Sequence, residues 1–184
     1  MMDRQSRIAL LTDHFRNPRH KGRLEPADAH MPGGNPGCGD VVTMHVRAAA
    51  DEDRIEEVSF EGDGCTISMA AASILVQRVN RTKMTFAEVD ELSYESIIDL
   101  LGRDVVGTRP RCATLALGTL KAAVRRIEMD RKLRAAGRSD DEIRQLREAI
   151  AEQAAGTGLV FGEEAGAAAR RTGTAQKQDP ASGA

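Results

Sequence analysis

Apolar and polar residues alternate over two neighbouring segments of the chain, residues 41–48 and 55–61. This two-residue period is typical of strands that bury one face. The apolar positions are Val42, Met44, Val46, Val58 and Phe60. Because the polar, acidic stretch between the two segments favours a turn, we predict an antiparallel hairpin with its apolar face covered by helices.

Helical periodicity dominates most of the remaining chain. The first predicted helix ends at Asn17, because the residue before a proline is disfavoured in helical backbone. Two later helices begin at capping-box patterns, Thr85–Glu88 and Ser139–Glu142. The predicted helices cover residues 4–15, 66–79, a short stretch after Thr85, residues 94–101, residues 111–135 and a last stretch after Ser139.

These elements predict an α+β fold, a small antiparallel sheet of about three strands packed on four to five α-helices. The stretch 19–37 is rich in Pro, Gly, Asp and His and predicts mostly loop, with at most a short edge strand. We expect a single domain over residues 1–136, an extra C-terminal amphipathic helix over 137–155 and a disordered tail over 156–184. The tail has too little apolar content to offset its chain entropy.

Composition excludes several classes of function. The 184 residues are 41% hydrophobic and 29% charged, which is ordinary for a globular protein. A formal charge of −2 leaves no basic patch for nucleic acid. We find no apolar run that spans a bilayer and no signal-peptide pattern, so we expect a cytoplasmic protein with no membrane partner. Thiols stay reduced there, and three cysteines cannot all pair within one chain.

Each cysteine lies at the predicted edge of a secondary-structure element. Cys38 and Asp40 lie in the loop that enters the first hairpin strand, and Gly39 between them permits backbone angles that let both side chains reach one metal. Cys65 lies between a strand end and a helix start, and Cys112 lies in the first turn of the long helix. Helix N-termini favour thiolates. Three thiols and one carboxylate make the four ligands of a tetrahedral site.

Simpler interpretations stand beside this one. Lone cysteines without a C-x-x-C pair are, on spacing alone, more typical of buried apolar residues than of ligands. Asp40 is equally explained as a turn residue. The glycine and proline neighbours favour the metal interpretation, since a core cysteine does not need them. The histidines are predicted to be solvated surface residues: His14, His20, His30 and His45.

Three ordered motifs carry a resemblance to a known family. They are Asn35–Asp40 (NPGCGD), Gly64–Ala70 (GCTISMA) and Arg111–Ala116 (RCATLA), preceded by Asp13–Arg19 (DHFRNPR). These motifs resemble the signatures of the U-type iron–sulfur cluster assembly proteins, which comprise the IscU, NifU amino-terminal and SufU proteins. The resemblance covers residues 5–135. It implies a single α+β domain that binds zinc or a [2Fe–2S] cluster, with ligands at Cys38, Asp40, Cys65 and Cys112.

Two departures favour one branch of that family. The cluster-building scaffolds generally have His before the third cysteine, where this chain has Arg111, and a Leu-Pro-Pro-Val-Lys segment upstream, where this chain has residues 107–110. In both respects the chain resembles the SufU branch, whose members hold zinc and relay persulfide sulfur from a cysteine desulfurase. The short step from Cys65 to Cys112 argues against the SufU branch, because SufU proteins usually have an insertion there.

The resemblance implies two hypotheses about function, and a third comes from a different class of protein. In the first, zinc is held by the four ligands, and Cys38 accepts persulfide sulfur and passes it to a downstream cluster-assembly scaffold or apo-protein acceptor. Such a protein is at most a sulfur carrier or sulfurtransferase. In the second, the same ligands assemble and transfer a [2Fe–2S] cluster, which Asp40 keeps labile. The third is a structural zinc domain or an adaptor. Arg111 and Gly39 are candidates to support the ligands from outside the metal's direct contacts.

Overall fold

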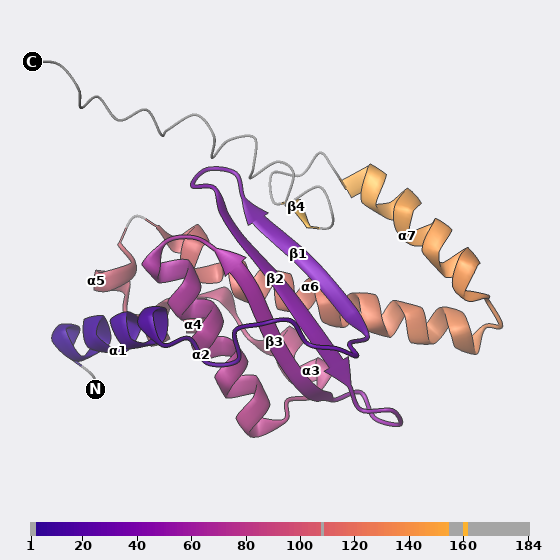
Figure 1. Cartoon of the computed structure of the whole chain (residues 1–184), viewed down its shortest axis with the longest axis horizontal. Helices are drawn as coiled ribbons and strands as arrows, with labels where there is room; N and C mark the ends of the chain where they lie inside the picture. The colour runs from indigo at the N-terminus through magenta and orange to yellow at the C-terminus, as the bar shows by residue number, and fades with distance from the viewer. Residues whose placement is uncertain (1–2, 108, 155–159, 162–184) are drawn as a thin grey trace, which may run out of the picture.

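The computed structural model describes residues 3–107, 109–154 and 160–161. Three antiparallel strands form the sheet: β1 (Ala29–Asn35), β2 (Asp40–Ala48) and β3 (Ile55–Asp63). A two-residue strand, β4 (Val160–Phe161), pairs with β1 at Gly33 and Gly34, so the strand order is β3-β2-β1-β4 (Figure 1). The predicted hairpin is therefore present as β2 and β3.

Helices pack against the sheet and complete the predicted α+β fold (Figure 1). Every helix predicted from periodicity is present, and both capping boxes form, at Thr85 with Glu88 and at Ser139 with Glu142. The single-turn helix α5 was not predicted. Within the described residues the helices are α1 (Arg4–Arg16), α2 (Thr66–Thr82), α3 (Phe86–Glu91), α4 (Tyr94–Leu101), α5 (Arg103–Val106), α6 (Pro110–Ala135) and α7 (Asp140–Ala154).

The core lies between one face of the sheet and the helices α2 and α6. The alternating apolar residues of the hairpin all have 0% exposed surface: Val42, Met44, Val46, Val58 and Phe60. On the helical side, small residues of α2 (Ala70, Ala71 and Ala72) are also buried, which allows the helix to approach the sheet closely. This packing fixes where the N-termini of α2 and α6 lie relative to the ends of the strands.

The main difference from the sequence prediction is β1, which lies where mostly loop was predicted. It is a seven-residue strand that pairs with β2 along its whole length, from Ala29 opposite Val46 to Asn35 opposite Asp40. Pro32 and the glycines that follow it are loop signals, but Gly33 has a packing role. A Cβ added to Gly33 would lie 2.0 Å from Thr119 Oγ1 of α6. Glycine therefore lets α6 lie directly against β1.

Two of the histidines predicted to be solvated are buried. His45 is 2% exposed, and its Nδ1 lies 2.6 Å from His30 Nδ1, while its Nε2 lies 3.1 Å from Glu61 Oε2. The phase prediction for His45 is correct, since it faces away from the core. However, that face of the sheet is not open to solvent at His45, because the connection between α1 and β1 runs over it (Figure 1). Ser59 Oγ donates to the Gly22 carbonyl of this connection at 2.7 Å.

His14 is the second buried histidine, and its Nδ1 lies 2.8 Å from Ser73 Oγ of α2. His20 is exposed, as predicted, and His30 is half-buried within β1 rather than in a loop. Burial lowers the pKa of His14 and of His45, because a charged imidazolium loses its hydration there. The charges of Arg19 and His30 act in the same direction on His14 and His45, respectively.

These lowered pKa values predict a stability that falls as the pH falls through about 6.5, the ordinary histidine value. The unfolded chain takes up protons there before the folded protein does, so the contribution is fully present above that pH and is lost below it. Urea unfolding between pH 8 and pH 5.5 measures the effect. His45→Gln should flatten the pH dependence, and an equally steep dependence in this variant would contradict the assignment.

The C-terminal helix α7 packs on α6. Ile143 is buried, and Arg147 forms a two-pronged ion pair with the buried carboxylate of Asp130, with Nε 2.9 Å from Oδ1. Apart from β4, the predicted disordered tail of residues 156–184 lies outside the described residues. Among the described helices, none combines the length and the apolar character that crossing a bilayer requires.

Candidate metal centre

The turn between β1 and β2 holds the first cysteine. Asn35 and Asp40 pair at the end of the hairpin, and residues 36–39 connect them. The Asn35 carbonyl accepts hydrogen bonds from the backbone N–H of Cys38 at 3.2 Å and of Gly39 at 2.9 Å. Gly39 has a φ of 72°, a left-handed conformation that favours glycine, as its position between the two candidate ligands predicts. This turn leaves Cys38 exposed and directs it towards Asp40.

Asp40 is oriented by the start of α2. Its Oδ1 accepts a hydrogen bond from the Cys65 backbone N–H at 3.0 Å. Its Oδ2 is thereby left facing two thiols, at 3.4 Å from Cys38 Sγ and 3.5 Å from Cys65 Sγ. Gly64 makes this approach possible, because an added Cβ would lie 3.0 Å from Asp40 Cγ and 2.6 Å from Ser68 Oγ. Asp40 itself is only 2% exposed.

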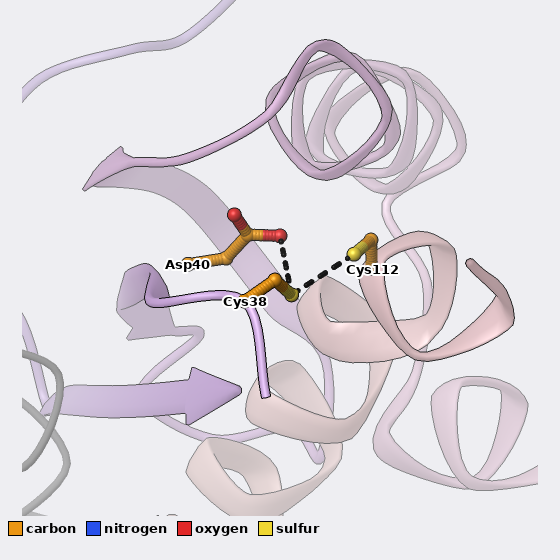
Figure 2. A group of neighbouring side chains, drawn as sticks. All are labelled: Cys38, Asp40 and Cys112. Carbon is orange, nitrogen blue, oxygen red and sulfur yellow. Dashed lines mark hydrogen bonds between the residues drawn. The ribbon is translucent and has the colours of Figure 1, made fainter. Parts of the chain in front are cut away.

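Cys112 comes from the first turn of α6, where Pro110 occupies the start of the helix. Its side chain is 2% exposed, and its Sγ lies 3.2 Å from Cys38 Sγ. Figure 2 shows Cys38, Asp40 and Cys112 pointing towards one another from the turn, from β2 and from α6. One ligand atom of each lies within 4.8 Å of the others. Cys65 lies outside this compact group but contacts it through Asp40.

Desolvation disfavours the thiolate forms of Cys112 and Cys38. It raises the pKa of Cys112 strongly, and the hydrogen bonds with Cys38 and Asp40 act in the same direction. Cys38 is exposed at the surface, but partial desolvation by its neighbours still raises its pKa. The helix N-terminus predicted to favour a thiolate at Cys112 is therefore outweighed by desolvation. A bound dication would reverse this balance, since it stabilises the thiolate form directly.

The donor set suits a soft or borderline metal. Thiolate sulfur with one carboxylate oxygen is a combination that zinc accepts in tetrahedral sites, and thiolates are also the usual ligands of iron–sulfur clusters. All three cysteines are free thiols, so none is withdrawn from the set by a disulfide. The residues present therefore fit either metal group.

Arg111 and two further residues surround the cysteines. The Arg111 side chain is exposed, and it takes part in none of the ion pairs between described residues. Ser68 Oγ, by contrast, donates to the Cys65 carbonyl at 3.0 Å and lies 3.6 Å from Cys65 Sγ. Asn35 Nδ2 lies 3.9 Å from Cys112 Sγ. Sequence reasoning missed both contacts; an Asn two residues before a Gly does signal an Asx turn, but not its reach to another helix.

Comparison with known proteins agrees with the motifs. A family model described as the NifU-like N terminal domain matches residues 8–134. The chain is 32% identical over 134 residues to the "iron-sulfur cluster assembly scaffold protein IscU" of Streptococcus pyogenes serotype M1, a match that covers 65% of this chain and 82% of the relative. It is 31% identical over 134 residues to the "zinc-dependent sulfurtransferase SufU" of Bacillus subtilis strain 168, covering 65% and 89%.

The fold also has solved counterparts. The crystal structure of a nitrogen-fixing NifU-like protein (N-terminal) from Brucella abortus superposes with a TM-score of 0.56 at 16% identity, covering 65% of this chain and 92% of that one. At that identity the likeness concerns the fold alone. Since the family model spans most of the α+β unit and all four candidate ligands, this chain belongs to the NifU-like N-terminal domain family of iron–sulfur cluster assembly proteins.

Proposed function

We propose that this protein accepts persulfide sulfur on Cys38 and passes it on for iron–sulfur cluster assembly, with zinc as its resident metal. One observation carries the proposal: within the compact group, Cys38 is exposed while Asp40 and Cys112 are buried. A group that must meet a sulfur donor on another protein has to be accessible, whereas groups that only hold a metal do not. The relative named as a zinc-dependent sulfurtransferase supports the same choice.

Zinc would be held by Cys38, Asp40, Cys65 and Cys112, and it would supply positive charge that keeps the thiolates deprotonated. The chain contributes the arrangement of these groups. Asp40 offers one oxygen, Oδ2, because the Cys65 N–H occupies the other. One metal ion would then bind three cysteines from separate elements, with no need for a C-x-x-C pair.

The sulfur transfer itself takes place at Cys38. Its thiolate attacks the outer sulfur of a persulfide on the donor enzyme, for which we propose a cysteine desulfurase. A new S–S bond forms at Cys38 Sγ as the donor's S–S bond breaks, and the donor cysteine leaves as a thiolate with the electron pair of that bond. No oxidant is needed, since the sulfane sulfur keeps its oxidation state. A downstream scaffold or apo-protein then takes the sulfur by the same exchange.

A second candidate is a scaffold that assembles and transfers a [2Fe–2S] cluster on the same four residues. The relative named as a scaffold, 32% identical over 134 residues, favours it. On this alternative, the Asp40 carboxylate would be the weak ligand, because iron–sulfur clusters prefer thiolates. Asp40→Ala should then lengthen the lifetime of the cluster.

Metal analysis after anaerobic purification separates the two candidates. We expect a colourless protein with about one zinc per chain, which gains one sulfane sulfur after incubation with a cysteine desulfurase and cysteine. Mass spectrometry after alkylation would locate that sulfur on Cys38. A red-brown protein with iron and sulfide, and no persulfide on Cys38, would reject sulfur transfer in favour of the scaffold.

A further inference from the structure

We infer that Asn35 is a positioning residue of the proposed metal site, where it sets the Cys38 turn and donates an amide N–H to the Cys112 sulfur. The inference rests on the proposed function, since it concerns how the same four ligands are held. Asn35 is only 4% exposed and stands at the last paired position of β1. It contacts the backbone N–H of Cys38 and the sulfur of Cys112, and the two cysteine sulfurs face each other at 3.2 Å.

The first contribution of Asn35 is to the shape of the turn. Its carbonyl accepts the N–H groups of Cys38 and Gly39, and its side-chain Oδ1 accepts the Gly37 N–H at 3.2 Å. One residue thus satisfies three successive backbone donors of residues 37–39. An Asx turn of this kind fixes the backbone before Cys38 and therefore the direction of its side chain.

The second contribution is across the site. The amide carbonyl oxygen is used by the turn, which leaves the Nδ2 group to find a partner in a buried place. Its partner is Cys112 Sγ, at 3.9 Å. A buried amide N–H without an acceptor loses its hydration with nothing in return, so this orientation of the N–H towards sulfur is favoured.

The hydrogen bond from Asn35 to Cys112 is strongest when Cys112 is a thiolate. An N–H donor stabilises negative charge on sulfur, and hydrogen bonds to ligand sulfurs tune both the affinity and the electronic properties of a bound metal. Asn35 therefore connects the turn that carries the accessible thiol of Cys38 with the buried thiol of Cys112. A residue that only shaped the turn would leave the Cys112 sulfur unaffected.

Asn35→Ser separates the two contributions. A serine hydroxyl can still accept the Gly37 N–H, but it lacks the amide N–H and is too short to reach α6. With Co²⁺ in place of zinc in the full-length protein, loss of the N–H donor raises the energy of the sulfur lone pairs. We expect the sulfur-to-cobalt charge-transfer band to move to lower energy. We also expect the zinc affinity, measured by chelator competition, to fall about 10- to 100-fold.

Asn80→Ser is the matched control. Asn80 makes two similar bonds far from the cysteines, since its Oδ1 accepts the Val58 N–H at 2.9 Å and its Nδ2 donates to the Val58 carbonyl at 2.7 Å. This variant should lower the unfolding temperature but leave the band and the zinc affinity as in wild type. If Asn35→Ser also leaves both unchanged, the inference is wrong. A wild-type protein without any sulfur-to-cobalt band would instead reject the proposed metal site itself, and the inference with it.

Discussion

Cys112→Ser is expected to weaken zinc binding strongly, because it removes a buried ligand. The loss should exceed the roughly 10- to 100-fold that is typical when a residue hydrogen-bonded to a ligand is replaced. The substitution should also lower the unfolding free energy of the metal-free protein by about 1–3 kcal/mol, since a hydroxyl replaces a thiol at a position that is 2% exposed. Chelator competition measures the first effect and urea unfolding measures the second. Sulfur uptake on Cys38 should become slower but remain detectable.

Cys38→Ser is the counterpart of that variant. It should abolish sulfur uptake, because the accepting atom is gone, yet leave the unfolding free energy of the metal-free protein within about 0.5 kcal/mol of wild type, because Cys38 is exposed. Alkylation followed by mass spectrometry counts the sulfane sulfur on each variant. If Cys112→Ser loses uptake completely while Cys38→Ser retains it, the roles proposed for the exposed and buried thiols are exchanged.

Gly33→Ala is expected to disturb the site without touching a cysteine. The added Cβ would lie 2.0 Å from Thr119 Oγ1 and 3.1 Å from Thr119 Cβ, so rotation of the Thr119 side chain leaves a tight contact that α6 relieves by moving away from β1. Overpacking of this kind costs about 1–3 kcal/mol in unfolding free energy. Because β1 leads into the Cys38 turn and α6 carries Cys112, the same movement should separate the two thiols and weaken zinc binding. Urea unfolding and chelator competition test both effects.

A double variant identifies the cause. Thr119→Ala removes the Oγ1 atom, so Gly33→Ala combined with Thr119→Ala should recover most of the stability and zinc affinity. Gly37→Ala is the control, since its added Cβ meets nothing closer than Asn35 Oδ1 at 3.4 Å, an ordinary contact. A double variant as unstable as Gly33→Ala alone would show that the contact with Thr119 is not the reason for the glycine.

The helices and the β2–β3 hairpin were predictable because their signals are local. Alternation in residues 41–48 and the capping box at Thr85 depend only on nearby residues, and both appear as predicted. β1 was not predictable in this way. Pro32 and Gly33 are local signals for a loop, yet Gly33 is required by a helix that begins far along the chain. His45 shows the same limit, since its face was correct but its cover comes from the connection before β1.

The members of the candidate site can be named from the amino-acid order alone: three cysteines and Asp40, each beside a residue that shapes the local backbone. Such neighbours act over a few bonds, so the residues can be identified from the sequence. The folded arrangement is needed to know which thiol is exposed and which is buried, which Asp40 oxygen faces the sulfurs, and that Asn35 contacts Cys112. These properties depend on how α2 and α6 pack against the sheet, and no local pattern encodes that packing.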